Sequence, residues 1–98
     1  MRKKIDVILI RLKENMPILR EKYKVKTLGV FGSYVRGEQK KGSDLDILVE
    51  FQEPVGIFQF MELEEFLEKR IGVKIDLVSK KALKPRIGKH ILEEVISV

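Results

Sequence analysis

Two aspartates interrupt an apolar run near the middle of this chain. In the segment DLDILVEF, Asp44 and Asp46 are separated by a single leucine. Side chains of a strand alternate between its two faces, so both carboxylates lie on one face while Leu45 and Ile47 lie on the other. Like charges this close destabilise a fold unless a cation lies between them. The pattern therefore predicts a strand with one buried face and one face suited to a hard divalent cation, Mg²⁺ or Mn²⁺.

A glycine and a serine end the preceding apolar run, and a basic loop then leads to the aspartates. Gly32 allows close approach of the backbone to a ligand, while the hydroxyl and free N–H groups at Ser33 can receive a phosphate. Arg36 and the loop lysines add positive charge beside that position. Ser43 most simply orients Asp44 or the entry to its strand, and it is also a candidate nucleotide-binding residue, as are Gly32, Ser33 and Arg36. A plain helix cap is the alternative role for Ser33.

A third aspartate, Asp76, alternates with apolar residues in the segment VKIDLV. Its carboxylate therefore points away from the apolar side of its strand, as those of Asp44 and Asp46 do. Three carboxylates on one open face could hold two divalent ions about 3.5–4 Å apart. Such a pair of ions clamps a triphosphate and activates an attacking hydroxyl, which is the chemistry of phosphoryl and nucleotidyl transfer.

The composition limits the class of protein. The chain has 98 residues, 44% of them hydrophobic, which suits one domain spanning 1–98. It contains no cysteine, so disulfides and thiolate-bound zinc are excluded. No apolar stretch approaches the roughly 20 residues that cross a bilayer, and no leader sequence is recognised, so we expect a cytoplasmic protein without membrane contact. The net charge is +5, but residues 44–68 carry only acidic charges. A basic surround with an acidic centre attracts nucleotides and holds a metal.

Hydrophobic periodicity predicts an α+β fold. Helices are expected at 3–15, 18–23, 57–70 and 87–95, and strands at 27–31, 44–51, 73–78 and 96–98. Pro17 is expected to separate the first two helices. This order predicts a small mixed β-sheet with helices packed on one face, which leaves the other face open for the carboxylates.

The helix expected at 57–70 has the clearest amphipathic pattern. Phe58 and Met61 are spaced for burial together with Leu63 and other apolar residues, whereas Glu64 and Glu68 are spaced for solvent. A glycine that follows the helix is a candidate C-cap.

The spacing of these motifs resembles a known superfamily. Gly32 and Ser33, ten intervening residues and then Asp-Leu-Asp resemble the GSx10DxD signature of the DNA polymerase beta-like nucleotidyltransferases. The fuller string GSYVRG…SDLDILV resembles the minimal nucleotidyltransferase (MNT) branch, and Asp76 lies where that branch carries its third carboxylate. The resemblance implies the palm fold of that superfamily, with Mg²⁺ on Asp44, Asp46 and Asp76 as catalytic residues. It also implies that Gly32 and Ser33 bind the nucleotide phosphates.

The length of the chain and its resemblance to the MNT branch together indicate which kind of molecule accepts the transferred nucleotide. A chain this small has no residues left for a nucleic-acid-gripping domain, so direct binding of nucleic acid is not expected and the acceptor is expected to be a protein. The resemblance implies an antitoxin that transfers AMP from ATP to a tyrosine of a HEPN-domain toxin. Two alternatives stay open, namely a masking antitoxin without chemistry and an enzyme that adenylylates a small molecule. A homo-oligomer formed through apolar residues near position 92 is also left open.

Overall fold

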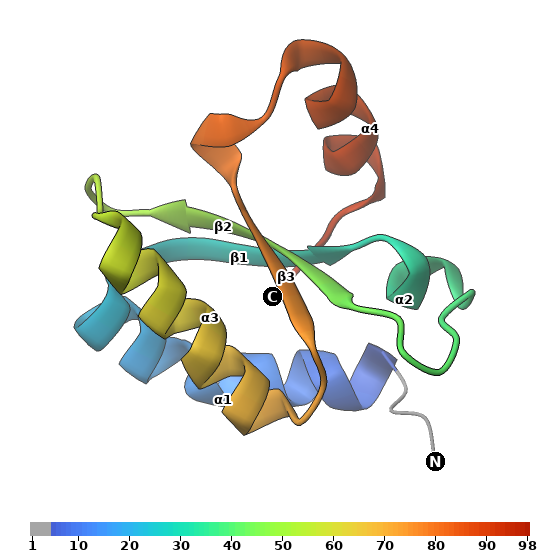
Figure 1. Cartoon of the computed structure of the whole chain (residues 1–98), viewed down its shortest axis with the longest axis horizontal. Coiled ribbons are helices and arrows are strands. Elements are labelled where there is room, and N and C mark those ends of the chain that lie inside the picture. The colour runs from blue at the N-terminus through green and yellow to red at the C-terminus, as the bar shows by residue number, and fades with distance from the viewer. Residues whose placement is uncertain (1–4) are drawn as a thin grey trace.

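The computed structural model describes residues 5–98 and confirms the expected mixed α+β architecture (Figure 1). The helices are α1 (Ile5–Tyr23), α2 (Ser33–Arg36), α3 (Ile57–Ile71), α4 (Pro85–Glu94) and the 3-10 turn η1 (Lys80–Ala82). The strands are β1 (Val25–Phe31), β2 (Leu45–Phe51), β3 (Ile75–Ser79) and β4 (Ile96–Ser97). They form one sheet in the order β3-β2-β1-β4, in which β2 pairs parallel with β3 and the other pairs are antiparallel.

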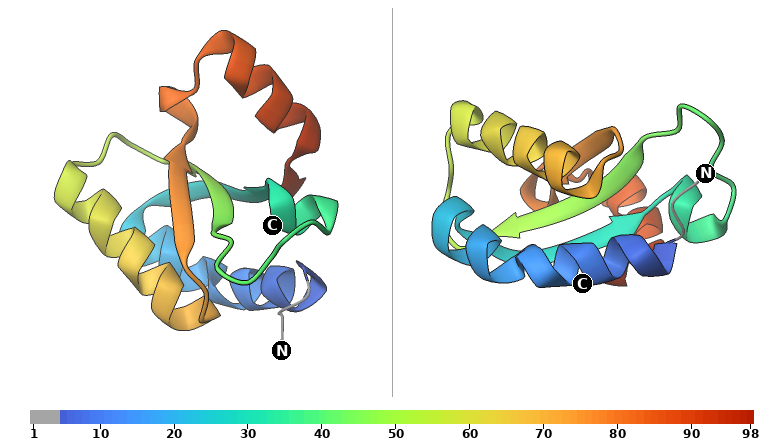
Figure 2. Two further views of the ribbon diagram at one scale, coloured as in Figure 1. Left: turned by 45° about the vertical axis from the view of Figure 1, so that its right-hand side comes forward. Right: turned by 90° about the horizontal axis from the view of Figure 1, so that it is seen from below.

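Two helices build the core against one face of this sheet. Figures 1 and 2 show α1 and α3 side by side on that face, while α4 stands on the opposite side of the sheet. Between the helices and the strands lie fully buried aliphatic side chains, namely Ile8, Leu12, Leu19, Leu45, Ile47, Val49, Leu63, Leu67 and Ile71. The prediction that helices share one face therefore holds for α1 and α3, and α4 is the exception.

The predicted helix break at Pro17 is wrong, because α1 runs through it from Ile5 to Tyr23. Buried residues continue at helical spacing on both sides of the proline, from Leu12 to Leu19. Pro17 itself is exposed, so the carbonyl that loses its helical bond can meet water, and packing of the buried stripe outweighs the local cost. The predicted start of this helix at Lys3 lies outside the described residues. Neither α1 nor any other helix in residues 5–98 is long and apolar enough to cross a membrane.

Several other boundaries move by one or two residues. β1 begins at Val25 rather than at residue 27, because Val25 pairs with Phe51 beyond a local irregularity in the ladder. β2 begins at Leu45, whose N–H donates to the carbonyl of Lys74 at 2.8 Å, so Asp44 precedes the strand instead of starting it. α4 begins at Pro85 itself, since proline suits the first helical turn, where no N–H is needed.

Burial of two apolar residues of α3 was predicted wrongly. Phe58 is 80% exposed and Met61 is 57% exposed. The buried stripe of the helix runs instead through Leu63, Leu67 and Ile71. At 3.6 residues per turn, Met61 lies about 200° around the helix from Leu63, which points it away from the sheet.

Two glutamates of α3, Glu64 and Glu68, also differ from their predicted solvent role, because they cover the open edge of the sheet. Glu68 accepts a hydrogen bond from the Ile75 N–H at 3.0 Å, and Glu64 accepts one from the Leu77 N–H at 3.3 Å. β3 is an edge strand, so these N–H groups have no neighbouring strand to bond to. Carboxylates from the adjacent helix therefore satisfy donors that would otherwise invite pairing with another chain.

Removing one of these carboxylates should weaken the fold measurably. We expect Glu68→Ala to lower the free energy of unfolding by about 1 kcal/mol, because the half-buried Ile75 N–H loses its acceptor. Glu65→Ala is the matched control, since Glu65 is exposed on the same helix, and it should change stability by less than about 0.5 kcal/mol. Urea denaturation of both variants makes the comparison. Equal effects of the two substitutions would contradict the edge-covering role.

Candidate active site

The turn after β1 can be built only with glycine. Gly32 has φ 83° and ψ −155°, a region of backbone conformation that is essentially closed to other residues. A Cβ at this position would also overlap the carboxylate of Asp46. The Gly32 carbonyl accepts hydrogen bonds from the Val35 and Arg36 N–H groups at 3.0 and 3.2 Å, which starts the short helix α2. The missing side chain thus lets the turn lie directly against Asp46.

The sheet brings the three predicted aspartates together. Asp46 on β2 and Asp76 on β3 are register partners in the parallel pair, and Asp44 lies immediately before β2. Asp46 is half-buried and Asp76 is exposed. Burial, then the negative charges of Asp76 and Asp44, raise the pKa of Asp46 to about 6, and Arg36 opposes that shift. The carboxylates therefore repel one another strongly enough to favour a proton, or another cation, on Asp46.

The donor atoms of this cluster suit a hard divalent cation, but their positions do not yet form a complete metal site. Its donors are carboxylate oxygens, which Mg²⁺ and Mn²⁺ prefer. The register pair of Asp46 and Asp76 supplies two of them on adjacent strands. Within residues 5–98, however, no three acidic or histidine side chains converge closely enough to hold a metal ion as they stand. Asp44, whose negative charge also acts on Asp46, is the third carboxylate of this cluster.

The serines differ in what they contact. Gly32 occupies the N-cap position of α2 and Ser33 is the first helical residue, so the alternative that Ser33 merely caps the helix is not supported. The Ser33 side chain is partly exposed beside the Gly32 turn. Ser43 closes its own loop, since its hydroxyl accepts from the Lys40 N–H at 2.8 Å and its N–H donates to the Lys40 carbonyl at 2.9 Å. That turn directly precedes Asp44, which fits the expected role of Ser43 in setting the entry to the strand.

A glutamate that sequence reasoning missed completes the surroundings of Arg36. The Arg36 guanidinium donates from Nε to Glu38 at 2.6 Å and from Nη1 to Glu94 Oε1 at 2.5 Å. These two carboxylates, Glu38 first, raise the pKa of Arg36. Glu94 Oε2 also accepts a hydrogen bond from the Gly32 N–H at 3.0 Å. Glu94 lies 62 residues beyond Gly32 in the chain, and no spacing or motif in the sequence signals this contact.

Glu94 is held as an anion by its two donors. Burial acts to raise the pKa of its carboxyl, but the hydrogen bond from the Gly32 N–H and the guanidinium of Arg36 outweigh burial and leave the pKa below its usual range. The Glu94 side chain is 24% exposed. A negative charge thus already lies at the turn that the sequence marks for phosphate.

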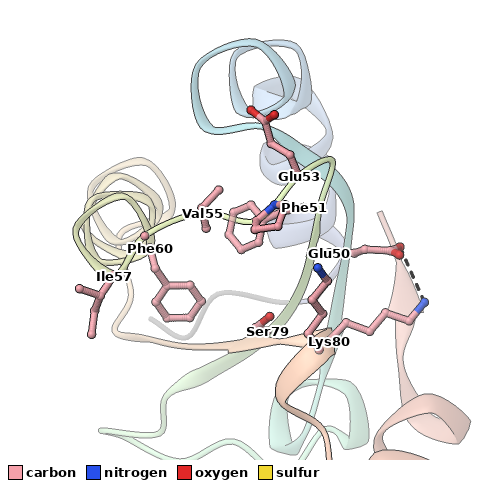
Figure 3. Close-up of a pocket in the computed structure, with 11 residues that line it drawn as sticks. Glu50, Phe51, Glu53, Val55, Ile57, Phe60, Ser79 and Lys80 are labelled. Atoms are coloured by element: carbon pink, nitrogen blue, oxygen red, sulfur yellow. Dashed lines mark ion pairs between the residues drawn. The ribbon is translucent and has the colours of Figure 1, made fainter.

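A cavity of about 620 Å³ lies at the other end of the strands (Figure 3). Phe51 and Phe60 line it, with ring centroids 6.3 Å apart, together with Val55, Ile57 and Lys80. The lining residues nearest to the aspartates along the strands are Glu50 on β2, four residues or about 13 Å from Asp46, and Ser79 on β3, three residues or about 10 Å from Asp76. The cavity is therefore a feature apart from the carboxylate cluster.

Comparison with known proteins agrees with this geometry. Residues 12–98 match the nucleotidyltransferase domain family. The protein adenylyltransferase MntA of Thermococcus cleftensis is 54% identical over 80 residues, which cover 82% of this chain and 81% of that protein. A solved structure, provisionally described as a minimal nucleotidyltransferase, superposes with a TM-score of 0.84 at 31% identity and covers 99% of this chain and 98% of that one.

A more distant structure shares the fold alone. It belongs to a complex described as a tri-AMPylated Shewanella oneidensis HEPN toxin with an MNT antitoxin. It superposes with a TM-score of 0.67 at 18% identity, and the match covers 92% of this chain and 70% of that one.

Proposed function

The chain belongs to the nucleotidyltransferase domain family, within its minimal branch, and from this premise we propose that it is a protein adenylyltransferase that moves AMP from ATP to a hydroxyl of a HEPN toxin. The observation that carries the proposal is the register pairing of Asp46 with Asp76 beside the Gly32 turn. The name of the Thermococcus relative supports the reaction, and the Shewanella complex of an AMPylated toxin with its antitoxin supports the partner. We expect the acceptor residue to be a tyrosine.

The reaction is an in-line displacement at the α-phosphorus of ATP. The acceptor oxygen forms the new bond to that phosphorus, the bond to the bridging oxygen breaks, and pyrophosphate leaves. The proton of the acceptor hydroxyl passes to a carboxylate, for which the exposed Asp76 is the candidate. Because Asp76 lies on the edge strand β3, a protein acceptor can approach it from outside the sheet. The Gly32 N–H, the Ser33 hydroxyl and Arg36 are the proposed phosphate contacts, at one side of the same cluster.

We assign Mg²⁺ to the carboxylate cluster as cofactor, with Mn²⁺ as a substitute. Asp46 and Asp76 would hold the metal from adjacent strands, and Asp44, just before β2, would complete the set. Two ions are proposed, as a triphosphate reaction of this kind commonly uses a pair. When bound, the metal neutralises charge on the phosphates and lowers the pKa of the attacking hydroxyl.

Co-expression with the cognate HEPN toxin tests the proposal. Intact-mass analysis of the toxin should show a gain of one or more AMP units that depends on ATP and Mg²⁺, and fragmentation should place them on tyrosine. Asp46→Asn should abolish the gain, whereas Glu53→Gln, an exposed acidic residue beyond the other end of β2, should leave it unchanged. If the toxin is unmodified but still co-purifies, the proposed AMP transfer is wrong and the protein is a masking antitoxin. An unmodified toxin that does not co-purify would favour a small-molecule acceptor.

A further inference from the structure

The Glu94 carboxylate occupies donors that the proposed triphosphate needs. One of its oxygens accepts from the Gly32 N–H at 3.0 Å, and the other accepts from the Arg36 guanidinium at 2.5 Å. These are a backbone donor and a cationic side chain that are both proposed to contact phosphate. A carboxylate with two bonded oxygens imitates two oxygens of a phosphate in charge and in hydrogen bonding.

Both anions cannot use these donors at once. The single Gly32 N–H hydrogen points to one acceptor, and a phosphate placed there would bring its negative oxygens against those of Glu94. In a partly buried site such a repulsion is screened less than in bulk water, so it opposes binding strongly. Arg36 is also shared already between Glu94 and Glu38, so it carries little uncompensated charge toward a ligand. Binding of the triphosphate therefore requires that Glu94 leave.

The chain that follows Glu94 explains why its carboxylate reaches the turn. Gly29 and Val30 on β1 pair with Ser97 and Ile96 on β4, so the C-terminal strand lies on the strand that leads into Gly32. A Cβ at Gly29 would come within 2.5 Å of the Val95 side chain. The absence of a side chain at Gly29 thus permits the close approach that positions Glu94 over the turn.

The helix that carries Glu94 lies beside a hollow and apart from the main helical layer. A hollow of about 510 Å³ separates α4 from η1, and Leu83, Gly88 and Leu92 are among the residues that line it. Figures 1 and 2 show α4 away from the α1–α3 layer that builds the core. A displacement of α4 would therefore release Glu94 without disturbing the packing of α1 and α3.

We propose that Glu94 is an internal competitor of the nucleotide: it occupies the anion site of Gly32 and Arg36 in the nucleotide-free protein and is displaced when a triphosphate binds. This inference rests on the proposed function, since it takes the same donors as the phosphate contacts. Its consequence is that nucleotide binding is coupled to the position of α4. The apparent affinity for ATP equals the intrinsic affinity multiplied by the fraction of time that the carboxylate leaves the donors free.

Calorimetric titration with ATP and Mg²⁺ tests the competition. If Glu94 occupies the donors for nine-tenths of the time, Glu94→Gln should raise the affinity about tenfold, because a neutral amide no longer competes as an anion. Glu93→Gln is the matched control, since it removes the same charge from the exposed neighbouring residue, and it should change the affinity less than twofold. Glu94→Asp keeps the charge and withdraws the oxygens by about 1.5 Å, so it should also tighten binding. Circular dichroism checks that each variant is folded.

The other outcomes separate this inference from the proposed function. If the wild type binds ATP and both Glu94 variants bind equally well or more weakly, the competition is refuted and Glu94 is a residue that positions Arg36. If Glu93→Gln tightens binding as much as Glu94→Gln, a long-range charge effect replaces the competition. If the wild type and every variant fail to bind ATP at millimolar concentration, the proposed function and the inference fall together.

Discussion

Replacing Asp46 by asparagine is expected to lower the rate of AMP transfer roughly a thousandfold while making the metal-free protein more stable at pH 8. The loss of rate follows because Asp46 is the central carboxylate of the cluster, in register with Asp76 and next to the Gly32 turn. The gain in stability follows because asparagine removes a half-buried charge that its neighbours repel. Toxin modification followed by mass spectrometry gives the rate, and urea denaturation in EDTA gives the stability. Wild-type rates in the variant would refute the catalytic assignment.

The stability gain should depend on pH in a defined direction. The pKa of Asp46 is raised from 3.8 to about 6 in the folded protein. The folded state therefore binds the proton more tightly than the unfolded state, and wild-type stability should fall as pH rises from about 4 to 6. Asp46 is partly exposed, so solvent screening reduces the effect to about 1 kcal/mol. The difference between Asp46→Asn and wild type should accordingly vanish near pH 4.

A matched control separates this effect from general surface charge. Glu53→Gln removes one negative charge from an exposed position beyond the far end of β2. It should change neither the transfer rate nor the pH dependence of stability. An equal gain in stability from both substitutions would show that net charge, rather than repulsion within the cluster, governs the fold.

Replacing Gly32 by alanine is expected to cost about 3 kcal/mol of stability and to abolish transfer. Two physical reasons add together. The backbone at φ 83° and ψ −155° is strained for any residue with a Cβ, at about 1–3 kcal/mol. The new methyl would also overlap the carboxylate of Asp46, which must then move from its present position. For a domain of this size the loss corresponds to a fall of about 12–24 °C in Tm, measurable by calorimetry.

Gly37 provides the matched control for this substitution. It also has a positive φ, 70°, but nothing lies within 4 Å of the position that its Cβ would take. Gly37→Ala should therefore cost only the left-handed backbone term, about 1 kcal/mol, and retain transfer. If the two alanine variants lost the same stability, the contact between Gly32 and Asp46 would have no energetic role.

The sequence alone was sufficient for most of the architecture and for the composition of the acidic cluster. Alternation in the runs around Asp46 and Asp76 places both carboxylates opposite the buried side chains, and the fold follows this pattern. Such local periodicities depend on the pitch of a helix or strand and can be read without tertiary contacts. The turn at Gly32 and the C-cap at Gly72 were also predicted from local sequence, and both glycines have a positive φ in the structure.

Where the predictions were wrong, packing between distant segments outweighed local preference. α1 continues through Pro17 because its buried stripe spans both sides of the proline. Phe58 is exposed because α3 packs against the sheet through the face that carries Leu63 and Leu67. Where a helix has two apolar stripes, periodicity alone does not show which of them is buried.

The sequence by itself determined which residues could hold phosphate and metal, because residue type and strand alternation are local properties. Only the tertiary structure decided which side chains from distant segments contact those residues. The pairing of β4 with β1 across Gly29 brings Glu94 onto the Gly32 N–H and Arg36, although 62 residues separate Glu94 from Gly32. Contacts between segments so far apart depend on sheet order and on close approach of backbones, which no local pattern encodes.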